Sequence, residues 1–196
     1  MDPFPRLHIV TGSRPMETVR AVLGLRSIAI QVRVDDTVTD RAAYELTRAI
    51  LELCRPAGVL CLVNDRIDVA VAAGADGAHV GADDLPPAAA RAVLGPAAVL
   101  GVTCRTPSDI PVDADYLGVG PAFPTSTKDG LPSPLGPNGV GAVAAAARVP
   151  VIAIGGVTAA RAGALRRAGA YGVAVVGAVS AAADPGRAAA ELLDAV

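Results

Sequence analysis

Eight short runs of apolar residues recur along this chain, and Ala-rich segments of helical character separate them. The runs are apolar throughout and do not alternate with polar residues, as is typical of parallel strands buried on both faces. We predict strands over residues 7–10, 28–34, 59–63, 77–80, 99–103, 116–120, 151–154 and 172–176. We predict helices over residues 16–25, 40–54, 67–73, 86–94, 140–147, 159–168 and 185–195.

Eight strand–helix alternations favour a closed (β/α)8 TIM barrel, and an open doubly wound sheet is the second choice. We expect one domain over residues 1–196, which is compact for a barrel. The fifth connection is unusual, because residues 104–114 include Pro107 and Pro111 and are fewer than a parallel crossover usually needs. We therefore expect helix five to be reduced or missing.

Composition excludes several classes of function. Hydrophobic residues make up 52% of the chain, aromatic residues only 3%, and Trp is absent, so Ala, Val, Leu and Ile must build the core. With a net charge of −2 and no Lys/Arg run, neither a nucleic acid nor a membrane is an expected partner. Cys54, Cys61 and Cys104 are widely spaced, which suits reduced core residues. Without a signal-peptide pattern in this sequence, we expect a cytoplasmic protein.

Polar residues follow the predicted strands at their carboxyl ends, where barrel enzymes place their chemistry. Gln31, Arg33 and Asp35 share one face at the strand period of two, and could hold a polar ring and a phosphate. Asp65 and Asp84 follow two neighbouring strands, and Mg²⁺ binds one or two carboxylates together with substrate phosphates. Capping of the next helix is the alternative interpretation for both aspartates.

A second group of residues suits a phosphorylated ligand. Residues 121–128 leave strand six and bring Thr125, Thr127 and Lys128, which offer two hydroxyls and an ammonium group. Ordinary loop residues are the alternative for these positions. Gly155-Gly156 and Gly177 follow strands seven and eight, where backbone N–H groups can approach an anion closely. His8 and His79 are interpreted as core histidines and not as ligands.

Taken together, these residues resemble the thiamine-phosphate synthase and thiazole tautomerase family across nearly the whole chain. The matching segments are 31–33, 63–66, 77–81 with Asp84, 101–103, 118–121, 125–128 and 154–156. The resemblance implies a (β/α)8 barrel, commonly a homodimer. It also implies that the synthase joins an aminopyrimidine methyl diphosphate to a hydroxyethylthiazole phosphate, giving thiamine phosphate and pyrophosphate.

The resemblance also implies roles for individual residues. Asp65 and Asp84 would hold Mg²⁺ against the diphosphate. Arg33, Lys128 and Thr103 would be the catalytic residues. The pyrimidine and its diphosphate would be held by Gln31, Arg33, Asn64, Thr103 and Lys128. The thiazole phosphate would be held by Thr125, Thr127, Gly156, Val176 and Gly177.

The chain departs from the synthase pattern at several positions. Asp35 stands where the family usually has a lysine, Ala82 where a glutamine is common, and Thr103 where serine is usual. A carboxylate close to a diphosphate would oppose binding. Three alternatives therefore stay open: a thiazole tautomerase-like paralogue, a catalytically impaired protein that binds thiamine precursors, and a phosphosugar isomerase. The tautomerase branch uses a histidine after strand six, where this chain has Pro121.

Overall fold

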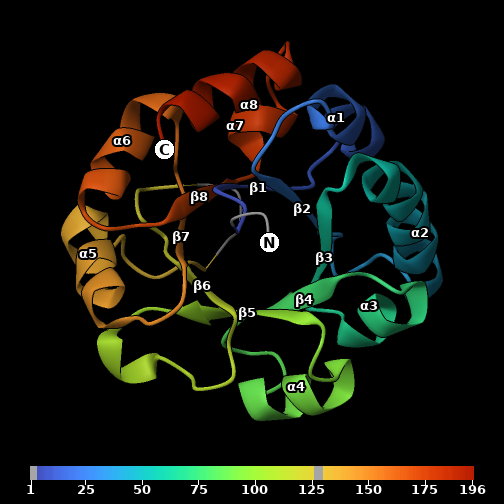
Figure 1. Ribbon diagram of the computed structural model, residues 1–196, viewed down its shortest axis with the longest axis horizontal. Coiled ribbons are helices and arrows are strands. Elements are labelled where there is room, and N and C mark those ends of the chain that lie inside the picture. Colours follow the sequence, from blue (N-terminus) through green and yellow to red (C-terminus); the bar gives the residue numbers. More distant parts are fainter. Residues whose placement is uncertain (1–3, 126–129) are drawn as a thin grey trace.

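Eight parallel strands close into a barrel in the order of the sequence. The structure, a computed structural model, describes residues 4–125 and 130–196. Each strand pairs with its neighbours in sequence, and β8 pairs with β1 to close the sheet (Figure 1). The strands are β1 Leu7–Val10, β2 Ile28–Val32, β3 Leu60–Asn64, β4 Gly77–Val80, β5 Val99–Cys104, β6 Tyr116–Val119, β7 Val151–Ile154 and β8 Gly172–Val175.

The helices form a ring around this barrel (Figure 1). They are α1 Pro15–Val22, α2 Asp40–Ala57, α3 Ile67–Ala73, α4 Pro87–Leu94, α5 Gly136–Ala146, α6 Ala159–Arg167, α7 Gly177–Ser180 and α8 Pro185–Asp194. The predicted barrel is confirmed, and so is the weak fifth connection. Between β5 and β6 the chain makes only the 3-10 turn η1, Pro107–Asp109, as the two prolines and the short length indicated.

Two apolar layers hold the barrel together. The larger one lies between the strands and the helices and consists mainly of Val, Leu, Ile and Ala side chains, as composition predicted. The smaller layer fills the barrel interior with Val10, Leu62, Tyr116, Ile152 and Ala174. Burying side chains on both faces explains why the strands lack an alternating pattern. The three cysteines are free and buried.

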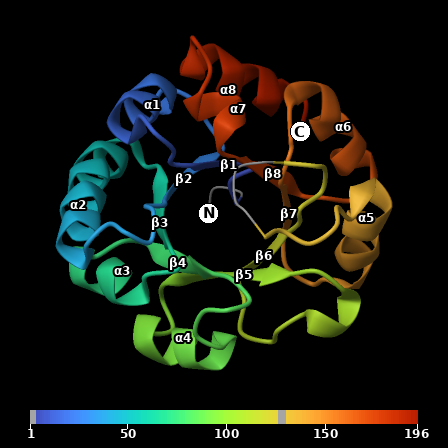
Figure 2. The ribbon, with the colours of Figure 1, turned by 180° about the vertical axis from the view of Figure 1, so that it is seen from behind.

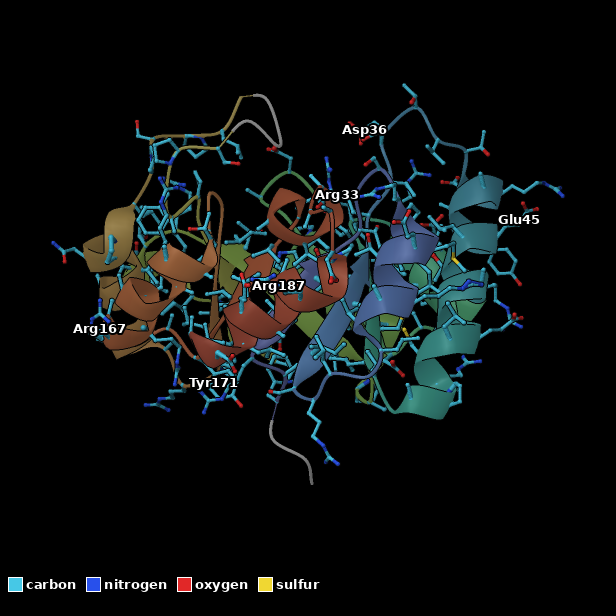
Figure 3. All side chains as sticks on the ribbon, turned by 90° about the horizontal axis from the view of Figure 1, so that it is seen from above. Arg33, Asp36, Glu45, Arg167, Tyr171 and Arg187 are labelled. Carbon is cyan, nitrogen blue, oxygen red and sulfur yellow. The ribbon has the colours of Figure 1, made fainter. Side chains whose placement is uncertain are left out.

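Aromatic rings close the amino end of the barrel. The ring of Phe4 packs against those of His8, Tyr116 and Tyr171, with centroids 5.4–6.3 Å apart. The first described residues approach the barrel axis, as the view from behind also shows (Figure 2). Figure 3 places Tyr171 at this end of the molecule and Arg33 and Asp36 at the opposite end. These packed rings therefore occupy the end of the barrel opposite to Arg33 and Asp36.

The helix ends differ slightly from the sequence-based predictions. α2 continues through Pro56 to Ala57 and ends where Gly58 adopts a left-handed conformation with φ of 65°. α7 was missed, because Gly177–Ser180 is a single turn that follows β8 directly. Among residues 4–125 and 130–196, we find no helix with both the length and the apolar character that crossing a membrane requires.

Candidate active site

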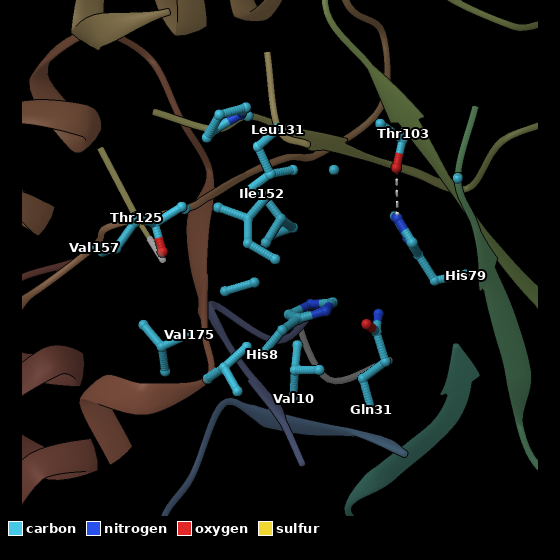
Figure 4. Close-up of a pocket in the computed structure, with 18 of the residues that line it drawn as sticks. His8, Val10, Gln31, His79, Thr103, Thr125, Leu131, Ile152, Val157 and Val175 are labelled. Carbon is cyan, nitrogen blue, oxygen red and sulfur yellow. Dashed lines mark hydrogen bonds between the residues drawn. The ribbon is translucent and has the colours of Figure 1, made fainter. Parts of the chain in front are cut away.

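One cavity of about 640 Å³ opens at the carboxyl ends of the strands. It brings together most of the residues that the sequence analysis singled out. Figure 4 shows Gln31, Thr103 and Thr125 among them. The cavity has two unlike sides. Polar side chains from β2 to β5 make one side, which we call the polar side. Glycine-rich backbone after β7 and β8 makes the other, which we call the glycine side. The predicted residues that line it are Gln31, Arg33, Asn64, Asp65, Thr103, Thr125, Gly156, Val176 and Gly177.

Arg33 is held on the polar side by Thr11, the residue that follows β1. The hydroxyl of Thr11 donates to the carbonyl oxygen of Arg33 and accepts from its backbone N–H, both at 2.8 Å. Thr11 is only 1% exposed, so these bonds are shielded from water. They continue the pairing of β1 with β2 beyond the last residue of β2. The backbone that carries the Arg33 side chain is therefore fixed at the cavity.

The expectation that Asp35 shares the face of Gln31 and Arg33 is wrong. Because β2 ends at Val32, the strand period of two does not continue to Asp35. Asp35 is exposed and does not line the cavity, while its carbonyl oxygen accepts a hydrogen bond from Arg66 at 3.2 Å. Arg66 also forms an ion pair with Asp40 at 3.0 Å.

Asp65 and Asp84 belong to the turns that follow β3 and β4. Asp65 lines the cavity in a left-handed conformation with φ of 63°, and its N–H donates to the carbonyl of His79 at 2.8 Å. A carboxylate oxygen of Asp84 accepts from the N–H of Gly81 at 2.6 Å. The N-cap residues of α3 and α4 are Arg66 and Pro86, so neither aspartate occupies the capping position.

A chain of hydrogen bonds crosses the polar side. Gln31 Nε2 donates to Tyr116 Oη at 3.3 Å, Tyr116 Oη lies 3.0 Å from His79 Nδ1, and His79 Nε2 lies 3.1 Å from Thr103 Oγ1. Figure 4 shows the last of these bonds. Burial lowers the pKa of His79 to about 4, while the charge of Asp84 acts in the opposite direction. Burial also raises the pKa of Tyr116. Both groups are therefore neutral near pH 7.

His8 occupies the floor of the cavity. It is fully buried, and neither ring nitrogen has a hydrogen-bond partner among the described residues. Burial, and to a smaller extent the neighbouring His79, lower its pKa to about 3. The interpretation of both histidines as core residues is thus correct for their burial, but both also line the cavity.

Backbone forms the glycine side. Gly155 and Gly156 follow β7 with φ of 93° and 63°. A Cβ atom on Gly156 would lie 2.5 Å from the carbonyl oxygen of Pro124, so only glycine fits. Arg161, from α6, donates to the carbonyl of Gly156 at 2.8 Å and places its guanidinium 4.9 Å from the ring centroid of Phe123. This side therefore offers backbone groups and a nearby cation.

Several lining residues were missed by the sequence analysis. Tyr116 was assigned only to a strand, although its inward position two residues before Gly118 could have indicated a lining role. Arg161 carries no pattern that sequence alone would single out. Arg105 donates to the carbonyls of Gly120 at 2.6 Å and Ser133 at 3.0 Å. The predicted Thr127 and Lys128 lie outside the described residues.

The fold and cavity define a class: a (β/α)8 barrel whose strand ends bring carboxylates, arginines and open glycine backbone to one ligand site. Such a site suits small phosphorylated molecules. The chain belongs to the thiamine monophosphate synthase family, whose model matches residues 7–179.

Similar proteins agree with this assignment. The thiamine-phosphate synthase of Salinispora arenicola is 56% identical, with 100% of this chain and 99% of the relative covered. That of Moorella thermoacetica is 45% identical over 94% of this chain and 90% of the relative. The solved thiamine phosphate pyrophosphorylase of Pyrococcus furiosus superimposes with a TM-score of 0.86 at 31% identity, covering 97% of this chain and 94% of that one.

Proposed function

We propose that this chain is a thiamine-phosphate synthase, a transferase that joins an aminopyrimidine methyl diphosphate to hydroxyethylthiazole phosphate and releases pyrophosphate. Membership of the family supports the activity. The observation that carries the proposal is a cavity that has two unlike sides. Two phosphorylated reactants need two anion sites within reach of each other, because their reacting atoms must meet.

The polar side suits the diphosphate and the glycine side the thiazole phosphate. On the polar side, Arg33 supplies a cation, and Asn64 and Thr103 supply neutral donors. On the glycine side, Gly156 and Gly177 expose backbone, and Thr125 adds a hydroxyl. In this proposal Lys128 and Thr127 complete the two sites, as the family resemblance implies.

Magnesium fits the donors on the polar side. Asp65 lines the cavity, and Asp84 acts electrostatically on His79, whose carbonyl accepts the N–H of Asp65. Asp84 itself is not among the residues that line the cavity, and one of its carboxylate oxygens accepts from the N–H of Gly81. Mg²⁺ binds one or two carboxylates and completes its octahedron with water and phosphate oxygens. We infer that Asp65 and Asp84 hold Mg²⁺. Once bound, the ion would neutralise charge on the departing pyrophosphate.

The reaction proposed for this site needs no general base. The C–O bond to the diphosphate breaks, and the electron-rich aminopyrimidine stabilises the methylene cation that remains. Arg33 and Thr103 stabilise the charge that develops on the leaving pyrophosphate. The thiazole nitrogen, positioned by its phosphate on the glycine side, then attacks the methylene carbon, and positioning supplies much of the rate.

An assay with both precursors tests this function. We expect pyrophosphate release only when both precursors and Mg²⁺ are present, with loss of release on addition of EDTA. Binding of both precursors without turnover would favour the impaired binding protein instead. Turnover of a thiazole substrate alone, without pyrophosphate, would favour the tautomerase.

Asp65→Asn tests the metal role. Asparagine tolerates the left-handed backbone of Asp65, so the change removes charge with little strain. We expect pyrophosphate release to fall by about a thousandfold or more, because the leaving group loses several kcal/mol of stabilisation. Thiazole-phosphate affinity, measured by calorimetry, should stay within about twofold.

Asp68→Asn is the matched control, since Asp68 is an exposed acid on α3 that does not line the cavity. Near-normal turnover of Asp65→Asn would remove Asp65 from the metal site.

The homodimer and the cytoplasmic location stay predictions. Light scattering coupled to size-exclusion chromatography tests whether the protein is a homodimer.

A further inference from the structure

The hydrogen-bond chain from Gln31 to Thr103 is built into the barrel interior. Tyr116 is 1% exposed and Gln31 5% exposed, so the middle of the chain is shielded from water. Two glycines make room for the rings. A Cβ atom on Gly101 would lie 2.1 Å from Tyr116 Cζ, and one on Gly118 would lie 2.6 Å from His79 Cε1. The positions and the space for both rings are therefore set by β5 and β6.

The groups in this chain fix the direction of its protons. The Nε2 amide of Gln31 can only donate, so Tyr116 Oη accepts there. The hydroxyl proton of Tyr116 then needs an acceptor, and His79 Nδ1 lies 3.0 Å away. If Nδ1 carried the proton instead, the buried Tyr116 hydroxyl would receive two donors, and its own proton would lose this acceptor at a considerable cost.

The same donor-to-acceptor order continues from His79 to the cavity. An imidazole whose Nδ1 accepts a hydrogen bond holds its one proton on Nε2, so His79 Nε2 donates to Thr103 Oγ1. Thr103 lines the cavity and is left to donate its own proton there. At the other end, Gln31 uses its Nε2 inward and keeps its amide oxygen, an acceptor, for a ligand.

We propose that Tyr116 is a positioning residue that fixes the Nε2–H tautomer of His79 and thereby makes the Thr103 hydroxyl a hydrogen-bond donor to the departing diphosphate. The hydrogen-bond chain ends in an acceptor at Gln31 and a donor at Thr103. These two ends match a ligand that has an amino group at one end and a phosphate oxygen at the other. The inference therefore rests on the proposed synthase function and deepens it.

The tautomer can be measured without substrate. The chain contains only two histidines, His8 and His79, so ¹⁵N–¹H correlation spectra of the imidazole rings hold two sets of signals. A His8→Phe variant assigns them. We expect the ring of His79 at pH 7 to be neutral with its proton on Nε2. A proton on Nδ1, or on both nitrogens, would overturn the proposal. Because no turnover is needed, this result is independent of the synthase assignment.

Tyr116→Phe removes the hydroxyl and keeps the ring. We expect the His79 signals to become those of a tautomer mixture, and kcat to fall about tenfold with a smaller change in KM for the pyrimidine diphosphate. Tyr171→Phe is the matched control, since it removes a hydroxyl that donates to Phe4 at the far end of the barrel. It should leave kcat within about twofold and the His79 signals unchanged.

A double-mutant cycle separates this role from a merely structural one. If Tyr116 acts through Thr103, Thr103→Val should cost about tenfold, and Tyr116→Phe in that background should cost little more. Thr103→Ser keeps the hydroxyl, so it should lose less activity than Thr103→Val. Losses that multiply in the double variant, or an unchanged His79 tautomer in Tyr116→Phe, would contradict the proposal.

Discussion

The two sides of the cavity offer a ligand different groups: side chains on the polar side and backbone on the glycine side. The polar side uses side chains that hydrogen bonds hold in place: Thr11 fixes the backbone that carries Arg33, and Tyr116 bonds the ring of His79. The glycine side uses the backbone itself, at Gly155 and Gly156, whose positive φ angles few other residues adopt. Ligand binding on the polar side therefore depends on single side-chain atoms, and ligand binding on the glycine side depends on the path of the main chain.

This difference predicts how each side responds to substitution. A side chain on the polar side can lose one group and leave the rest of the barrel in place. On the glycine side an added methyl group must move backbone, and the backbone after β7 packs against the segment after β6. Substitutions there should affect binding and stability together, while those on the polar side should separate the two.

Gly156→Ala should have the largest effect of the three changes considered for this comparison. Its Cβ would lie 2.5 Å from the Pro124 carbonyl oxygen at a φ of 63°. The strain should cost about 1–3 kcal/mol, lower the melting temperature, and weaken thiazole-phosphate affinity at least about tenfold. Calorimetry and thermal unfolding measure the two effects.

Gly24→Ala controls for the general cost of replacing glycine, because a Cβ there would meet nothing within 4 Å. If Gly156→Ala kept both the affinity and the stability of the wild type, the glycine side would not depend on its backbone path.

Thr11→Val should have an intermediate effect confined to the polar side. Valine has a similar shape but leaves the N–H and the carbonyl of Arg33 without the hydroxyl that pairs both. We expect KM for the pyrimidine diphosphate to rise about tenfold, a cost of about 1.4 kcal/mol, while thiazole-phosphate affinity stays unchanged.

Thr18→Val is the matched control for this change. Thr18 is also fully buried, but its hydroxyl has no hydrogen-bond partner among the residues described, so its loss should be neutral or stabilising. Equal effects of both substitutions on KM would mean that Thr11 acts through packing and not through Arg33.

Sequence reasoning was strongest where each residue has one possible structural role. The eight apolar runs predicted the barrel and the order of its strands, because strands buried on both faces must be apolar throughout. The two prolines in residues 104–114 likewise predicted the lost helix. Gln31, Arg33 and Thr103 were placed at the cavity because strand ends converge there, and Asn64 because of the family resemblance.

Sequence reasoning failed where a role depends on contacts between distant residues. Thr11 and Tyr116 are ordinary strand-end residues until pairing brings them to Arg33 and His79, which lie 22 and 37 positions away. Asp35 was misplaced because the strand period was extended beyond the true end of β2. The position at which β2 stops is set by its pairing with β1 and β3, which the local pattern does not encode.

Asp35→Lys should have the smallest effect, and it tests whether the departure from the family pattern matters. Asp35 is exposed and does not line the cavity, so solvent and salt screen its charge from a bound diphosphate. The described cations that do line the cavity are Arg33, Arg105 and Arg161. We expect kcat/KM at about 0.15 M salt to change by less than about twofold. A rise of tenfold or more, largest at low salt, would mean that the loop after β2 brings this carboxylate to the leaving group during turnover, and the polar side would then extend beyond Arg33.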